Sequence, residues 1–481
     1  MFRFTTIKDY HKSLLNGHVT SVQAVQFYVD SILSKSHLNA FLEVYKDEAL
    51  QQAKLCDEAT ASGKSLGKLH GVIVGLKDVI CQKGHKVSAS SKILEGFTSV
   101  YNATVVERLL AEGAIVIGRQ NCDEFAMGSS NENSAYGPVK NAVDETRVPG
   151  GSSGGSAVAV QADLCMVTLG SDTGGSVRQP ADFCGIVGLK PTYGRISRYG
   201  LIAYASSFDQ IGIFSKSVED AALILQVIAG PDEFDSTVSQ QAVPDYTSLL
   251  QQESTQKYKI AYFKDALEHP GLDVEIAASM RKQIETLRQQ GHEVTQIDFD
   301  LLEYIVPAYY VLTTAEASSN LSRFDGVRFG YRAQLDKSDD LTELYKKSRS
   351  EGFGKEVQRR ILLGTFVLSA GYYDAYFTKA QQVRRLLIDK TQAIFKNYDF
   401  IISPTVPTPA FKIGEKTNDP IEMFLGDIYT VFANLTGIPG ISIPMFKHSN
   451  GMPFGMQIMA NHFNEVNLHA VAQDMMENAA S

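Results

Sequence analysis

Apolar residues recur at helical spacing near the start of the chain, at Val22, Val25, Val29, Ile32 and Leu33. Thr20 precedes them and Gln23 stands three positions later, in the order of a capping box, so this pattern predicts an amphipathic helix. A second helix is predicted from about Asp47 to Ala61, because Gly63 then interrupts the pattern. The first part of the chain is therefore helical, and neither helix carries residues suited to chemistry.

Short, continuous apolar runs follow and predict buried strands at Val72–Leu76 and Gly113–Gly118. Runs without polar positions are typical of strands that are covered on both faces. In the second half, a strand from Tyr258 to Phe263 precedes a charged helix from about Asp273 to Gln290. Val466 to Met476 predicts a closing amphipathic helix. This alternation of strands and helices predicts an α/β fold.

The stretch from Gly150 to Ser176 has a different pattern. Two Gly/Ser clusters, Gly150–Ala157 and Ser171–Ser176, flank an apolar run, Val158–Leu169, that is long enough for a buried helix or strand. A flexible linker is the ordinary interpretation of one such cluster, but not of two clusters joined by a buried run. A Walker phosphate loop is excluded because no lysine follows either glycine pair. Glycine backbones that approach a ligand closely, with hydroxyls beside them, indicate a nucleophile next to its own oxyanion hole.

Composition and charge limit the functions and locations that this protein can have. The 481 residues carry a formal net charge of −9, which disfavours nucleic acid over most of the surface. Five cysteines without a C-x-x-C pair predict reduced, buried thiols. Charged residues interrupt any signal peptide near the N-terminus, and no apolar stretch reaches the roughly 18 residues of a membrane span. We therefore expect a soluble, cytoplasmic protein that contacts no membrane.

Lys77 follows the predicted strand Val72–Leu76 directly and is the first candidate catalytic residue. One interpretation is a surface ion pair with its neighbour Asp78. The other is a desolvated amine with a lowered pKa, since lysine is rarely interior unless it is paired. Such an amine can act as a base. The pattern alone leaves both interpretations open.

Three motifs together resemble the amidase signature family: Lys77 in Val-Gly-Leu-Lys-Asp, Gly-Gly-Ser-Ser-Gly-Gly-Ser at 150–156, and Gly-Ser-Asp-Thr-Gly-Gly-Ser at 170–176. The resemblance implies Ser176 as the nucleophile, Ser152 as a bridging serine and Lys77 as the base. It also implies a cis peptide before Ser152. Acyl transfer through an acyl-enzyme is the expected reaction.

The resemblance further implies an oxyanion hole made by the backbone N–H groups of Thr173, Gly174, Gly175 and Ser176. The fold expected from it is one large α/β domain over residues 1–481, in which helices cover both faces of a central mixed β-sheet. The catalytic signature region would span about 70–200. Asp209 is expected either to bond nearby backbone or to serve as a turn residue.

The second half is similar to one branch of the family, the glutaminase subunits of tRNA-dependent amidotransferases. Motifs around Pro307–Tyr310, Glu316–Gly326 and Gly371–Tyr376 carry this resemblance. Asp427, Arg360 and the Tyr309 hydroxyl match the residues that bind glutamine in that branch. A guanidinium suits the α-carboxylate because it can bind both oxygens. The sequence itself does not separate Tyr309 from Tyr310, or Arg360 from Arg359.

The same branch implies the partners. The chain would form a heterotrimer with B and C subunits, and ammonia from glutamine would pass to the B subunit. With ATP and Mg²⁺, that partner would amidate Glu-tRNA(Gln) or Asp-tRNA(Asn), and it would make most of the tRNA contacts. We expect no cofactor and no metal in this chain, because no His/Cys/Asp cluster has ligand spacing. A stand-alone amidase for a small or hydrophobic amide is the alternative, and a scaffold with a vestigial site is a third hypothesis.

Overall fold

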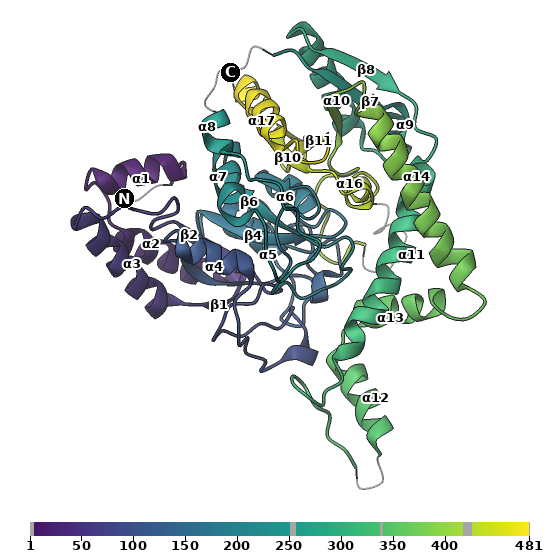
Figure 1. The fold of residues 1–481 in the computed structure, drawn as a ribbon, viewed down its shortest axis with the longest axis horizontal. Helices are drawn as coiled ribbons and strands as arrows, with labels where there is room; N and C mark the ends of the chain where they lie inside the picture. The colour runs from purple at the N-terminus through teal and green to yellow at the C-terminus, as the bar shows by residue number, and fades with distance from the viewer. Residues whose placement is uncertain (1–3, 251–255, 337–339, 417–425, 481) are drawn as a thin grey trace.

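The computed structural model describes residues 4–250, 256–336, 340–416 and 426–480. Within these residues the strands form one mixed sheet in the order β1-β3-β2-β4-β6-β5-β10-β11-β9-β7-β8 (Figure 1). The pairs β2–β3, β2–β4, β7–β8 and β7–β9 are parallel, and the others are antiparallel. The predicted α/β class with a central mixed sheet is therefore confirmed.

The strands are β1 (Phe41–Val44), β2 (Ile73–Lys77), β3 (Ile115–Gln120), β4 (Val167–Asp172), β5 (Val187–Lys190), β6 (Gln210–Ser215), β7 (Lys259–Phe263), β8 (Glu293–Ile297), β9 (Phe400–Pro404), β10 (Gly440–Lys447) and β11 (Pro453–Ala460). The strands β2 to β6 are buried along their whole length, including the polar residues at their ends, as is typical of strands covered on both faces.

The helices of the first half are α1 (Ile7–Leu15), α2 (Ser21–Ser34), α3 (Lys46–Ala61), α4 (Thr104–Ala111), α5 (Gly154–Gln161), α6 (Arg178–Cys184), α7 (Val218–Ile228) and α8 (Tyr246–Leu250). Those of the second half are α9 (Lys264–Glu268), α10 (Val274–Gln289), α11 (Leu302–Asn320), α12 (Leu341–Gly352), α13 (Lys355–Val367), α14 (Lys379–Ile394), α16 (Val431–Thr436) and α17 (Glu465–Ala480).

Helices cover the sheet on both faces, as expected. α5 and α6 pack together against β2, β4, β5 and β10, whereas α7 and α17 pack together against β5, β6, β10 and β11. α11 lies against α13, α14 and α16. In Figure 1, α11, α13 and α14 lie on the right-hand side of the molecule, and α16 lies nearer the sheet. The second half of the chain thus places α11, α13 and the start of α16 next to the sheet (Figure 1). α11 carries Tyr309 and Tyr310, α13 carries Arg360, and Asp427 lies just before α16.

The local patterns predicted the early elements well. The capping box at the start of α2 is present in both directions, because the Thr20 side chain accepts from the Gln23 N–H and the Gln23 side chain from the Thr20 N–H. The apolar run Val158–Leu169, left open between helix and strand, divides into the end of α5 and the start of β4. Asp163 stands between the two elements with φ of 55°.

The single domain over 1–481 remains a prediction, and one sheet shared by both halves of the chain supports it. The polar segment 231–256 contains α8, and its residues 251–255 lie outside the described residues. All five cysteines are free thiols, four of them buried. In the part of the chain that is described, no helix is long and apolar enough to cross a bilayer.

Two neighbouring parallel strands place the first site residues. β2 ends at Lys77 and β4 ends at Asp172, and the two strands pair in parallel from Val74–Val167 to Leu76–Leu169. The carboxyl ends of parallel strands lie at the same edge of a sheet, which is where α/β proteins commonly bind ligands. This edge is therefore the candidate active site.

Candidate active site

Lys77 is fully buried, and its Nζ donates to three serine hydroxyls. The Nζ–Oγ distances are 2.7 Å to Ser152, 2.9 Å to Ser153 and 2.8 Å to Ser171. Burial lowers the pKa of Lys77 to about 8, against the opposing influence of nearby acidic groups that include Asp123. The structure thus favours a desolvated amine over a surface pair with Asp78. Once one proton is lost, Nζ can accept a proton from a serine at the same distance.

Ser152 follows a cis peptide bond between Gly151 and Ser152, as the resemblance implied. Its segment is held by backbone contacts on both sides: the Gly151 N–H donates to Gln179 (2.9 Å), and the Asp123 N–H donates to the Ser152 carbonyl (3.0 Å). A Cβ at Gly151 would lie 2.1 Å from Asp123 Oδ2, so only glycine fits here. These contacts fix the Ser152 hydroxyl beside Lys77.

The third expected residue, Ser176, lies in the turn between β4 and α6. Ser176 is 7% exposed, and within the described residues its hydroxyl makes no hydrogen bond. The N–H groups of Thr173, Gly174 and Ser176 have no partner there either. The Gly175 N–H, by contrast, already donates to Asp172 Oδ1 (2.8 Å). Gly175 therefore stays only an expectation as an oxyanion donor, whereas the N–H groups of Thr173, Gly174 and Ser176 are open to a ligand.

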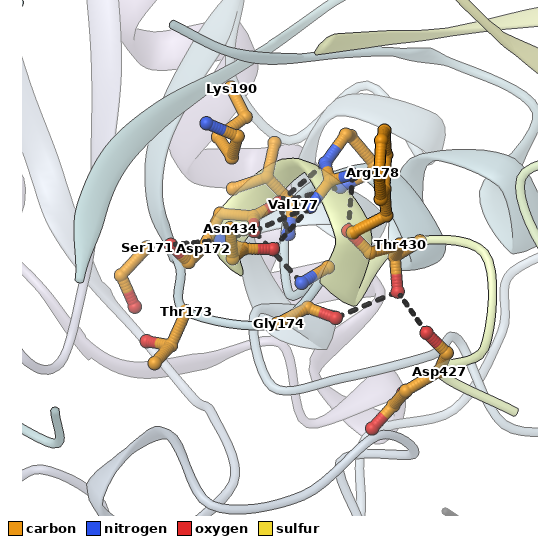
Figure 2. Close-up of polar contacts among 12 residues, drawn as sticks. Ser171, Asp172, Thr173, Gly174, Val177, Arg178, Lys190, Asp427, Thr430 and Asn434 are labelled. Atoms are coloured by element: carbon orange, nitrogen blue, oxygen red, sulfur yellow. Dashed lines mark hydrogen bonds and ion pairs between the residues drawn. The ribbon is translucent and has the colours of Figure 1, made fainter. Parts of the chain in front are cut away.

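Asp172 organises this turn, and sequence reasoning gave it no role. Its carboxylate accepts from the Gly175 and Val177 N–H groups and pairs with Arg178 at 3.0 Å (Figure 2). Both charged side chains are completely buried. Burial alone would raise the pKa of Asp172, but the charge and hydrogen bonds of Arg178 hold it well below its usual value. The sequence feature that could have indicated this role is the occurrence of two opposite charges, Asp172 and Arg178, in a segment that is otherwise predicted to be buried.

Arg178 connects the turn to the C-terminal part of the chain. Its Nη1 donates to the Thr430 carbonyl (2.8 Å) and its Nη2 to Asn434 Oδ1 (2.7 Å), both visible in Figure 2. Asn434 in turn donates to Asp172 Oδ1 at 2.9 Å. These contacts between residues more than 250 positions apart leave no local pattern in the sequence, so Thr430 and Asn434 were missed.

Thr173 is held separately. Its hydroxyl donates to Asp209 Oδ1 (2.7 Å), and Asp209 also accepts from the N–H groups of Tyr204 and Ala205. Burial raises the pKa of Asp209 to about 6. Of the two interpretations left open for Asp209, the structure therefore shows the backbone-bonding one.

Asp427 lies just before α16, near the same turn. Its carboxylate accepts from the hydroxyls of Ser129 (2.9 Å) and Tyr310 (2.8 Å). Burial raises the pKa of Asp427 to about 6, so the group is an anion near neutral pH. It is a buried anionic acceptor, which is what an ammonium group of a ligand requires.

Tyr309 and Tyr310 have different places. The Tyr310 hydroxyl bonds Asp427, whereas the Tyr309 hydroxyl lies over Gly174, where an added Cβ would approach it to 2.3 Å. The Tyr309 ring packs edge-on against Phe208. Both tyrosines therefore lie at the site: Tyr309 contacts the turn, and Tyr310 contacts the carboxylate.

Arg360 is buried on the inner side of α13, whereas Arg359 is 47% exposed and pairs with Glu356. Arg360 Nη1 donates to the Tyr204 hydroxyl (2.7 Å), and its Nε donates to Glu356 (2.9 Å). Its guanidinium also lies 5.5 Å from the Tyr310 ring centroid. Of the two arginines, Arg360 is thus the one beside Tyr310 and Asp427. In the described part of the chain, no group of three or more His, Cys, Asp or Glu residues is placed to hold a metal ion.

A buried lysine bonded to serine hydroxyls, next to a serine-bearing glycine turn, is an arrangement suited to amide hydrolysis. The chain belongs to the amidase family, whose sequence model matches residues 23–468. A relative from Koribacter versatilis (strain Ellin345), named as the A subunit of glutamyl-tRNA(Gln) amidotransferase, is 53% identical over 449 residues, 93% of each chain.

Two solved structures share the fold over nearly the whole chain. The A subunit of glutamyl-tRNA(Gln) amidotransferase from Thermotoga maritima is 38% identical with a TM-score of 0.80, covering 99% of this chain and 95% of that one. Peptide amidase from Stenotrophomonas maltophilia is 29% identical with a TM-score of 0.83, covering 99% and 97%. The backbone therefore does not separate the branches of the family, whereas sequence identity favours the amidotransferase subunits.

Proposed function

We propose that this chain is the glutaminase subunit of a tRNA-dependent amidotransferase. The observation that carries the proposal is the pairing of two sites at one sheet edge: Lys77 bonded to Ser152 beside the Ser176 turn, and Asp427 with Tyr310 across from it. The first provides acyl-transfer chemistry, and the second provides an acceptor for the α-ammonium of an amino acid. The identity to the amidotransferase relatives supports glutamine as that amino acid.

In the proposed reaction, neutral Lys77 takes a proton from Ser152, which takes one from Ser176. The Ser176 oxygen then attacks the side-chain amide carbon of glutamine. The N–H groups of Gly174 and Ser176 hold the oxyanion, and removing such a donor typically costs about 3–4 kcal/mol. Ser152 returns a proton to the leaving nitrogen, which departs as ammonia. Water then hydrolyses the γ-glutamyl ester to glutamate by the same proton route.

Glutamine would be oriented by its amino-acid end. Asp427 accepts from the α-ammonium group, the Tyr309 hydroxyl adds a polar contact, and Arg360 faces the α-carboxylate as a planar cation. These roles are supported by the burial of Arg360 and Asp427 around the shared neighbour Tyr310.

The ammonia would serve partner B and C subunits in a heterotrimer. The B subunit would use ATP and Mg²⁺ to amidate Glu-tRNA(Gln), Asp-tRNA(Asn) or both, and would hold most of the tRNA. The net charge of −9 on this chain is consistent with a tRNA bound mainly elsewhere. The protein would act in the cytoplasm.

Glutamate release from glutamine tests the proposal, measured with the chain alone and then with candidate B and C subunits, ATP and misacylated tRNA. We expect strong stimulation by the full mixture and no activity in Ser176→Ala. The alternative, a stand-alone amidase, predicts hydrolysis of simple amides that ignores the partners. Asp427→Ala separates the two functions. If glutamine is the substrate, this variant should hydrolyse glutamine far more slowly and a simple amide at an unchanged rate. A stand-alone amidase does not predict this difference between the two substrates.

A further inference from the structure

The turn that leads into α16 places the carboxylate of Asp427 and the side chain of Thr430 on one rigid segment. The Asp427 carbonyl accepts from the N–H groups of both Thr430 and Val431, at 3.1 Å each. Asp427 and Thr430 therefore move together, and a displacement of one displaces the other. In Figure 2 this segment faces the oxyanion turn, with Asp427 and Gly174 on either side of Thr430.

Thr430 is completely buried and reaches across to that turn. Its hydroxyl donates to the Gly174 carbonyl at 2.7 Å, with the Asp427 carbonyl as a second, longer acceptor at 3.1 Å. A hydroxyl has a single proton to donate, so the shorter contact with Gly174 is the principal one.

The contact fixes a specific peptide unit. The Gly174 carbonyl and the Gly175 N–H belong to the same planar peptide. Thr430 holds its oxygen, and Asp172 holds its N–H at 2.8 Å. With both ends held, the plane cannot rotate, so the N–H groups on either side, those of Gly174 and Ser176, keep their direction.

The approach of Thr430 is close enough to require glycine opposite it. Gly175 has φ of 120°, and an added Cβ would lie 2.2 Å from Thr430 Oγ1. The Thr430 carbonyl also accepts from Arg178 Nη1 at 2.8 Å, and Arg178 pairs with Asp172 at 3.0 Å. Thr430 therefore contacts the oxyanion turn through its side chain and, by way of Arg178 and Asp172, through its backbone.

We propose that Thr430 is a positioning residue that couples occupation of Asp427 by a substrate ammonium group to the orientation of the Gly174–Gly175 peptide. The inference rests on the proposed glutaminase function. An ammonium group that binds Asp427 fixes the segment before α16, and Thr430 transmits this to the oxyanion donors. An amide without the ammonium group binds next to a less well oriented turn and reacts more slowly. Selectivity then lies in kcat as well as in KM.

The experiment compares glutamine with glutaramate, which lacks only the α-amino group, as substrates of the chain together with its partner subunits. The variants are Thr430→Val, which replaces the hydroxyl by a methyl group of similar shape, and Thr430→Ser, which keeps the hydroxyl. We expect Thr430→Val to lower kcat for glutamine about 10- to 100-fold, as for a lost buried hydrogen bond, with little change in KM. Its kcat for glutaramate should change far less, and Thr430→Ser should restore the wild-type ratio.

The ratio of kcat for the two substrates decides between coupling and a merely structural role. If Thr430→Val lowers kcat for both substrates by the same factor, or lowers neither, the inference is wrong. Thr430→Ala removes the hydroxyl without a bulky replacement and gives the same comparison if the valine variant does not fold. Failure of the underlying function is visible separately, because the wild-type protein would then not release glutamate from glutamine.

Discussion

The proton acceptor of the site predicts a specific pH dependence. Lys77 must be neutral to take a proton, and its pKa is lowered to about 8 by burial. At pH 7 about a tenth of the molecules then carry a neutral amine, and at pH 9 about nine-tenths do. We therefore expect kcat for glutamine to rise about tenfold between pH 7 and pH 9 and to level off above it. The rate is measured with glutamine at saturation, so that loss of the α-ammonium proton from free glutamine near pH 9 does not enter. Initial rates of glutamate release over this range measure the effect.

Lys77→Arg is the matched control, because arginine keeps the positive charge and cannot be deprotonated in proteins. It should be inactive across the whole range. A second control is a stability measurement, since a lysine with a lowered pKa binds fewer protons when folded than when unfolded. Between pH 8 and about 10.5 the wild-type protein should gain stability relative to Lys77→Met. A flat rate profile between pH 7 and pH 9, or an active arginine variant, would refute the role of Lys77.

Three further predictions concern the residues around the triad. Arg360→Lys should raise KM for glutamine about 10- to 100-fold, because lysine lacks the planar guanidinium group that can bind both carboxylate oxygens. The control Arg359→Lys changes an exposed residue and should leave KM within about twofold of the wild-type value. Steady-state kinetics of the two variants measure the difference. Asp172→Asn leaves Arg178 buried without its counter-charge and should lower the free energy of unfolding by about 3–5 kcal/mol in denaturant titrations. Below its pKa of about 6, protonation of Asp427 should raise KM for glutamine, while KM for glutaramate stays constant between pH 5 and pH 7.

Local patterns were sufficient for the elements that depend on short-range spacing. The predicted helix at 273–290 is α10, with Asp273 as its N-cap, and the predicted strand at 72–76 is β2, shifted by one residue. That shift makes Lys77 the last residue of a buried strand rather than the first residue of a loop. The resemblance placed the cis peptide at Gly151–Ser152, which the structure contains.

The remainder depends on contacts that no local pattern encodes. Sequence motifs place Gly175 among the oxyanion donors, but its N–H is engaged by Asp172. Ser153 and Ser171 share Lys77 with Ser152, and three serines in two clusters offer no pattern that separates them. Pro307 would ordinarily interrupt a helix, yet it lies inside α11.

The central claim is that Ser176 forms a covalent acyl-enzyme with glutamine. Rapid acid quenching of the complex during glutamine turnover, followed by mass spectrometry of the peptide that contains Ser176, tests it most directly. We expect a γ-glutamyl ester on Ser176 in the wild-type protein and an unmodified peptide in Ser176→Ala. An unmodified Ser176 during active turnover, or the ester on another residue, would contradict the account.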